Sequence, residues 1–147
     1  MKNNSELDYY HFLNNISLEE TKEGIYFIQN ADGYIKIGES VDIKKRITNY
    51  KTHSPTPVWL CGYILTTSRK DNEYLQQQVW RIFRVHREWY APCFALVDYI
   101  KCFENGIGLA IENLPFIPSN YKELYWMQNA KGNKNLYDLS KDVEVSL

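Results

Sequence analysis

Three residues with side chains suited to binding a phosphate lie close together in the sequence: Tyr26, Lys36 and Arg46. A guanidinium offers fixed, bidentate hydrogen-bond donors to phosphate oxygens, and an ammonium offers a compact positive charge. Lys44 and Lys45 directly precede Arg46, so this short segment can meet an anion with several charges. Each residue also has an ordinary alternative role, as a half-buried strand aromatic, an exposed strand lysine or a helix-surface charge.

A β-hairpin is predicted to hold two of these residues. Residues 25–29 and 34–37 are rich in β-branched and aromatic side chains, and an Asp-Gly pair at 32–33 separates them. Asp-Gly between two such runs is a hairpin signal. Tyr26 and Lys36 are therefore expected on facing strands.

A helix over residues 40–50, with Ser40 as its N-cap, is predicted after the hairpin. Arg46 and the two lysines before it lie mostly off the apolar stripe of this helix, where their charges stay hydrated or meet an anion. A strand over residues 58–65 and helices over residues 72–83 and 94–103 are predicted to follow. The apolar stripe of the first helix consists of Ile43, Ile47 and Tyr50.

These elements predict an α/β (α+β) domain in which helices flank a small three-stranded antiparallel sheet. A chain of 147 residues is the size of one domain and long enough to bury a sizeable core. We divide it into an N-terminal helical extension (1–22), the domain itself (23–106) and a partly ordered C-terminal extension (107–147).

The charge of the chain is unevenly distributed. Residues 36–88 carry ten lysines and arginines against five acids, whereas the remainder carries seven against thirteen, within a net charge of −1. A basic centre inside an acidic frame fits a polyanion site. A solvated charged face is the commoner interpretation of a local excess.

The composition favours a reducing, intracellular compartment. The three cysteines form an odd number without CxxC spacing, which argues against a disulfide framework or a zinc site of the usual kind. No apolar run approaches the roughly 20 residues that span a bilayer, and the Asn-rich start lacks the apolar core of a signal peptide. We therefore expect a cytoplasmic protein without a membrane partner.

Several spaced motifs, in the same order, resemble the GIY-YIG nuclease superfamily over roughly residues 23–92. Gly24-Ile25-Tyr26 and Lys36-Ile37-Gly38 stand where that family has its two tripeptide motifs, and Arg46 follows on the helix. The resemblance is closest to a phage-encoded branch whose second motif ends in Lys-Ile-Gly. In that branch the second helix reads Leu-Glu-x-x-Leu-His-x-x-Phe before Glu-Trp-Phe. The corresponding residues here are Leu75, Gln76, Val79, Trp80 and Phe83, followed by Glu88, Trp89 and Tyr90.

The resemblance implies metal-assisted hydrolysis of a DNA phosphodiester in a bacterium or a phage-infected host. Tyr26 would act near the attacking water as base or positioning group, and Arg46 would balance charge on the pentavalent phosphate. Lys36 replaces the second tyrosine of the family, where it could hold a phosphate or lower the pKa of Tyr26. Transition-state charge stabilisation of this kind is commonly the largest catalytic contribution. We expect Glu88 to meet a basic partner and Trp89 to bury a large area against the sheet.

The metal ligand is where the sequence departs from the family. The carboxylate that holds Mg²⁺ or Mn²⁺ in the family corresponds to Gln76, and an amide lacks the negative charge that hard cations prefer. Glu73 lies one turn earlier on nearly the same helical face, so it is the candidate substitute. The alternative for Glu73 is an ordinary acid in the first turn of the helix, where a negative charge interacts favourably with the helix dipole. Trp80, where histidine is usual, supplies a stacking or core surface instead.

Three functions are compatible with the sequence. A metal-dependent endonuclease requires that Glu73 serves as ligand or that Gln76 is not the native residue. A nucleic-acid-binding module without catalysis would keep the phosphate-binding face and lose the metal. A protein-interaction factor would use the acidic frame, and its binding would lack the steep salt dependence of the other two. The residues predicted to contact nucleic acid are Lys44, Lys45, Lys51, Arg81 and Arg84.

Overall fold

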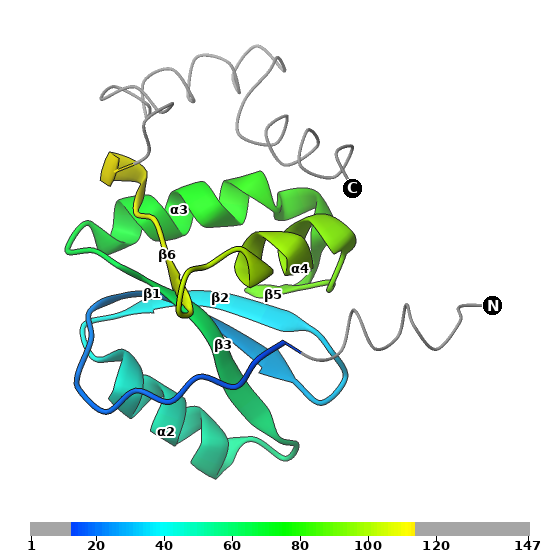
Figure 1. Ribbon diagram of the computed structural model, residues 1–147. Helices are drawn as coiled ribbons and strands as arrows, with labels where there is room; N and C mark the ends of the chain where they lie inside the picture. The colour runs from blue at the N-terminus through cyan, green and yellow to red at the C-terminus, as the bar shows by residue number, and fades with distance from the viewer. Residues whose placement is uncertain (1–12, 114–147) are drawn as a thin grey trace.

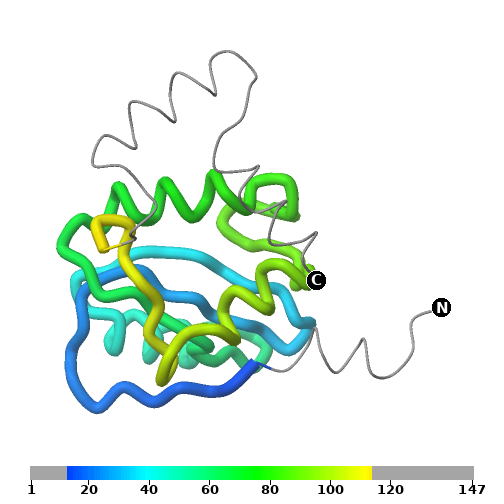
Figure 2. Tube along the Cα trace, turned by 45° about the horizontal axis from the view of Figure 1, so that its top comes forward, coloured from blue at the N-terminus to red at the C-terminus, as the bar shows by residue number. Residues whose placement is uncertain are grey.

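A six-stranded mixed sheet with helices on both faces makes up residues 13–113, the part of the chain that the computed structural model describes (Figure 1). The strand order is β4-β5-β2-β1-β3-β6. One face of the sheet carries α2 and the other carries α3 and α4, as the second view also shows (Figure 2). The elements are β1 (Gly24–Asn30), β2 (Ile35–Ser40), α2 (Ile43–His53), β3 (Val58–Leu65), α3 (Arg69–Val79), η1 (Arg81–Phe83), β4 (Arg84–His86), β5 (Trp89–Tyr90), α4 (Phe94–Lys101), β6 (Ile107–Gly108) and η2 (Ile111–Asn113).

The sheet is larger than the three strands predicted. The predicted strands β1, β2 and β3 form its antiparallel centre, with β1 in the middle. β5 and β4 extend the sheet beside β2, and β6 pairs with β3 in parallel, so the sheet is mixed. The added strands contain only two or three residues each. Such segments are too short for an alternation pattern to reveal them.

The predicted N-cap of the first helix is wrong by two residues. Asp42 caps α2, because its carboxylate accepts a hydrogen bond from the backbone N–H of Lys45 at 3.0 Å. Ser40 still belongs to β2, where it pairs with Gly24, and its hydroxyl accepts from the Asp42 N–H at 3.0 Å. Both residue types are good caps, and the strand register decides between them.

Asn72, predicted near the start of the second helix, lies inside α3 and is buried. Its amide nitrogen donates to the Thr66 hydroxyl at 3.2 Å and to a Glu112 carboxylate oxygen at 3.1 Å. Its amide oxygen accepts from the Ile111 N–H at 2.8 Å. A single buried side chain thus ties the start of α3 to η2. The helix ends at Val79 rather than at residue 83, and its last predicted turn is the 3₁₀ helix η1.

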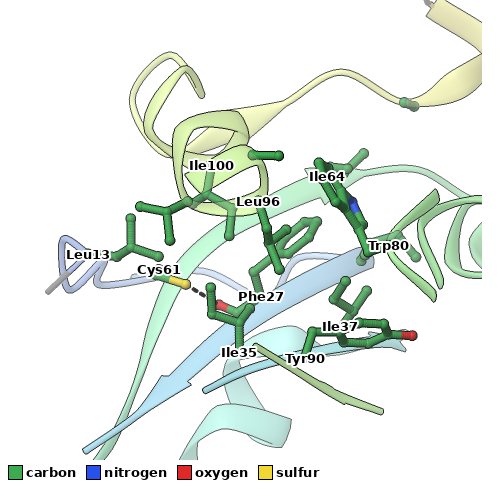
Figure 3. Close-up of a cluster of buried hydrophobic side chains, with 14 residues drawn as sticks. Leu13, Phe27, Ile35, Ile37, Cys61, Ile64, Trp80, Tyr90, Leu96 and Ile100 are labelled. Atoms are coloured by element: carbon green, nitrogen blue, oxygen red, sulfur yellow. Dashed lines mark hydrogen bonds between the residues drawn. The ribbon is translucent and has the colours of Figure 1, made fainter. Parts of the chain in front are cut away.

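Two hydrophobic clusters, one on each face of the sheet, follow from the alternation along β1. Ile25 and Phe27 point into the larger cluster, which α3 and α4 cover. Figure 3 shows Phe27 below Leu96 of α4, with the buried Cys61 thiol donating to the Phe27 carbonyl at 3.2 Å. Tyr26 and Ile28 point into the smaller cluster beneath α2. This alternation turns the Tyr26 side chain towards the helix that carries Arg46.

The segments flanking residues 23–106 also contact the sheet. The backbone N–H of Ile16 donates to the Leu60 carbonyl at 2.8 Å, and Leu13 is buried in the larger cluster. Residues 107–113 form β6 and η2. Most of the helix predicted near the N-terminus and most of the C-terminal extension lie outside the described residues. Within residues 13–113, no helix has the length and apolar character needed to cross a membrane.

Candidate active site

Tyr26, Arg46 and Tyr50 meet between β1 and α2. Tyr26 is 1% exposed. The Arg46 guanidinium donates to its hydroxyl at 3.4 Å, and the Tyr50 hydroxyl lies 3.4 Å from the same oxygen. Arg46 itself is exposed, so its remaining donors can reach a ligand. The structure therefore brings together two of the residues that the sequence singled out.

The Tyr26 ring lies across Gly38 on the neighbouring strand. The two residues are directly paired, and a Cβ atom at position 38 would overlap the Tyr26 hydroxyl and ring. The glycine of the Lys-Ile-Gly motif is thus explained by close approach of a side chain. Without it, Tyr26 could not occupy its place beside Arg46.

We expect Gly38→Ala to displace Tyr26 from Arg46. Overpacking of this kind costs about 1–3 kcal/mol, so the urea midpoint of unfolding should fall without a change in slope. Near-UV circular dichroism should change as well, because the tyrosine environment is altered. An unchanged midpoint and spectrum would mean that the Tyr26 ring does not lie across Gly38.

Lys36 lies on the same face of the sheet as Tyr26, at a diagonal position. It is opposite Ile28 on β1, and its ammonium donates to a Glu88 carboxylate oxygen at 2.8 Å. The rings of Tyr50 and Trp89 lie 5.5 Å and 5.8 Å from the ammonium. The expectation that Glu88 meets a basic partner is confirmed. Because Tyr50 contacts both Tyr26 and Lys36, it joins the two parts of the site.

Tyr26 is a neutral phenol in this environment. Burial raises the pKa of Tyr26 well above its ordinary value, and the hydrogen bond to Tyr50 raises it further. The charge that opposes this effect is Arg46 rather than Lys36, and it does not offset burial. The suggestion that Lys36 lowers the pKa of Tyr26 is therefore wrong. Of the two roles considered for Tyr26, positioning by hydrogen bonds fits this environment better than proton abstraction.

Gln76 does not face the site. It is 6% exposed and lies in the core, where its amide nitrogen donates to the Tyr99 hydroxyl at 2.7 Å. Its amide oxygen accepts from the Trp80 indole N–H at 3.1 Å. The two residues that depart from the family pattern, Gln76 and Trp80, are thus hydrogen-bonded to each other. The spacing of residues along α3 does not show that the Gln76 side chain is buried, because one of its hydrogen-bond partners, Tyr99, belongs to another helix.

A second face of α3, which carries Glu73 and Gln77, faces the edge of β2. Gln77 donates from its amide to the Ile37 carbonyl at 3.3 Å, and Glu73 lies one turn earlier on the same face. Burial, followed by the carboxylates of Glu88 and Glu39, raises the pKa of Glu73 to about 7. Lys36 is one of the groups that oppose this shift. Glu73 is therefore electrostatically coupled to the Lys36–Glu88 pair.

Glu73 is the one carboxylate considered for the metal that lies outside the core. No group of three or more His, Cys, Asp or Glu side chains able to hold a metal ion occurs within residues 13–113. Mg²⁺, however, is commonly bound by one or two carboxylates together with water and substrate phosphates. Burial and two neighbouring carboxylates disfavour the ionised form of Glu73. A nearby cation would stabilise that form. Glu73 could therefore contribute one carboxylate ligand to such an ion.

The five basic residues predicted to contact nucleic acid do not form one patch. Lys44 and Lys51 line a cavity of about 150 Å³ between α2 and residues 16–18, and the Lys44 ammonium donates to the Glu19 carbonyl at 2.9 Å. Lys45 is exposed on the same helix. Arg81 belongs to η1, where its guanidinium donates to the Gln78 carbonyl at 3.1 Å, and Arg84 is exposed in β4. Two basic regions, on α2 and beyond α3, therefore lie apart from each other.

The site also includes residues that the sequence reasoning did not assign to it. The sequence pattern places Tyr50 in the apolar stripe of its helix, and its position four residues after Arg46 is the signal that it can reach the site. Gln77 had no distinguishing feature, because three glutamines follow one another in α3. Comparisons of this chain with protein-family models, with curated proteins and with solved structures found no match.

Proposed function

We propose that this chain has a GIY-YIG-like fold and hydrolyses a DNA phosphodiester at the face formed by Tyr26, Lys36 and Arg46. The observation that supports this most directly is the Tyr26 hydroxyl, held within 3.4 Å of Arg46. A buried lysine on the same strand face adds a second positive charge. A cation in contact with a buried phenol, together with a second cation on the same face of the sheet, is suited to a phosphate and its developing charge.

Each side chain has a distinct part in the proposed reaction. Arg46 is exposed and would bind phosphate oxygens through the donors that do not contact Tyr26. Tyr26 stays protonated and would orient the nucleophile or a phosphate oxygen by hydrogen bonding. Glu73, which is electrostatically coupled to the Lys36–Glu88 pair, would hold Mg²⁺ or Mn²⁺ at the edge of β2, and such a cation would supply positive charge to a phosphate bound at Lys36. Lys36 would neutralise a neighbouring phosphate.

A nucleic-acid-binding module without hydrolysis is the second candidate. The observation in its favour is the burial of Gln76 with Trp80 and Tyr99, since the residue at the expected metal position is committed to the core. In this case Arg46 and Lys36 would still bind phosphates. Binding would depend on Arg46 and fall steeply with salt, but no strand would be cut.

Cleavage of supercoiled plasmid and of branched DNA, with Mg²⁺ or Mn²⁺, tests the proposal. We expect Arg46→Ala to slow cleavage about 100-fold, the effect of removing one preorganised donor from a transition state. Lys101→Ala, which removes one positive charge from α4 on the other face of the sheet, is the matched control. Binding by the parent without cleavage supports the module. Absence of both would leave a protein-interaction function.

A further inference from the structure

We propose that Lys36 binds a phosphate of the nucleic acid at the position that the Glu88 carboxylate occupies, and that Glu88 is a resident counter-ion which the ligand displaces. The inference rests on the proposed function and names one of its phosphate-binding positions. It also gives Glu88 a role in setting affinity. Removing Glu88 should therefore strengthen binding.

Unequal burial of the two partners indicates which of them can leave. The Lys36 side chain is 11% exposed, whereas the Glu88 side chain is 44% exposed. A buried ammonium without an anion is costly, so Lys36 requires a partner at all times. A half-exposed carboxylate regains water when it separates from the ammonium. The pair is thus suited to exchange of the anion around a fixed cation.

Two aromatic rings keep the ammonium in place whichever anion it contacts. Tyr50 and Trp89 lie 5.5 Å and 5.8 Å from the Lys36 nitrogen, within the range of cation–π attraction. Tyr50 also contacts the Tyr26 hydroxyl at 3.4 Å. An anion bound to Lys36 would consequently lie next to the Tyr26–Arg46 pair, where successive phosphates of one strand could be bound.

The backbone around Glu88 allows its side chain to move alone. Its carbonyl accepts from the Ile37 N–H at 3.1 Å, and the next residue, Trp89, pairs with Lys36. These contacts fix the main chain at the edge of β2. Release of the carboxylate therefore requires only a rotation of the side chain.

Binding measurements in EDTA, where no cleavage occurs, test the exchange. Short duplex DNA and inorganic pyrophosphate are titrated into the parent, Glu88→Gln and Glu104→Gln, with folding checked by circular dichroism and thermal unfolding. Glu104 is exposed and lies near β6, at the opposite edge of the sheet, so it controls for the change in net charge. Should Glu88→Gln fail to fold, Glu88→Asp replaces it, because the shorter side chain also weakens the pair.

We expect Glu88→Gln to bind DNA about fivefold more tightly than the parent, the factor that a partly exposed salt bridge is worth. In the parent, the Glu88 carboxylate that the DNA displaces takes up a cation from solution, whereas in Glu88→Gln no such carboxylate is released. The slope of log K against log salt should therefore steepen by about one in the variant. Glu104→Gln should change affinity by less than about twofold. Adding Lys36→Met to Glu88→Gln should abolish the gain.

Equal or weaker binding of both ligands by folded Glu88→Gln would overturn the exchange. If Arg46-dependent cleavage persists in that case, the proposed function still stands. Conversely, tighter pyrophosphate binding by Glu88→Gln, with no DNA binding by any variant, would refute the proposed function and support the anion site at Lys36. The two failures are therefore distinguishable.

Discussion

Replacing Glu73 by Gln is expected to lower DNA cleavage on the order of 1,000-fold, the loss that corresponds to several kcal/mol of metal-derived stabilisation. The substitution keeps the shape of the side chain and removes the negative charge that a hard cation requires. Duplex binding in EDTA should change little. The measurement is nicking of supercoiled plasmid in Mg²⁺, and Glu104→Gln is the matched control.

The pH dependence of the same residue gives an independent check. Burial and two neighbouring carboxylates raise the pKa of Glu73 to about 7, so its contribution to stability is present at low pH and is lost as pH rises through about 7. Glu73→Gln, which stays neutral, should therefore gain stability relative to the parent between about pH 4.5 and 7. Parent cleavage should rise as pH passes through about 7, because Glu73 then loses its proton. Cleavage by Glu73→Gln at the parental rate would remove Glu73 from the site.

Gln76→Glu is expected to destabilise the fold by about 2 kcal/mol at pH 8 and to leave cleavage no faster. The side chain is buried between Tyr99 and Trp80, and a carboxylate there loses its hydration. The Trp80 indole N–H and the Tyr99 hydroxyl, which can rotate to donate, would partly compensate for this lost hydration. Burial would raise the pKa of this carboxyl, so the loss of stability should shrink as pH falls and the acid becomes neutral. Urea unfolding at several pH values measures it.

Gln78→Glu makes the same chemical change on the same helix at a half-buried position. Its effect on stability should stay within about 0.5 kcal/mol. If Gln76→Glu instead proves as stable as the parent and accelerates cleavage, the side chain must leave the core to reach the metal. That result would show that a carboxylate at position 76 can serve as the metal ligand.

The parts of the fold with strong local signals were predictable. An Asp-Gly pair between two β-type runs gave the β1–β2 hairpin, and three apolar residues at helical spacing gave α2. These two elements suffice to bring Tyr26 near Arg46. The residue at the helix start could not be predicted from local sequence, because Ser40 and Asp42 are both good caps and only pairing across the sheet distinguishes them.

The orientation of α3 was the main feature that local patterns could not determine. Its polar residues occupy two faces: Asn72 and Gln76 point into the core, whereas Glu73 and Gln77 face the edge of β2. A buried polar residue is stable only if distant partners satisfy it. For Gln76 one of these partners is Tyr99 of α4, and no pattern within α3 reveals that contact. The same limitation concealed the short edge strands.

The hydrogen bonds of Asn72 also tie α3 to residues beyond 106. Its amide has partners in the loop before α3 and in η2, at Thr66, Ile111 and Glu112. A fragment cut at residue 106 would lack two of them and would also leave β3 without its parallel neighbour. Each orphaned buried group costs about 1–3 kcal/mol, a large part of the stability of a small domain. We therefore expect a fragment to need η2 in order to hold α3 in place, and a protease that cuts between α4 and β6 to loosen the helix that carries Glu73.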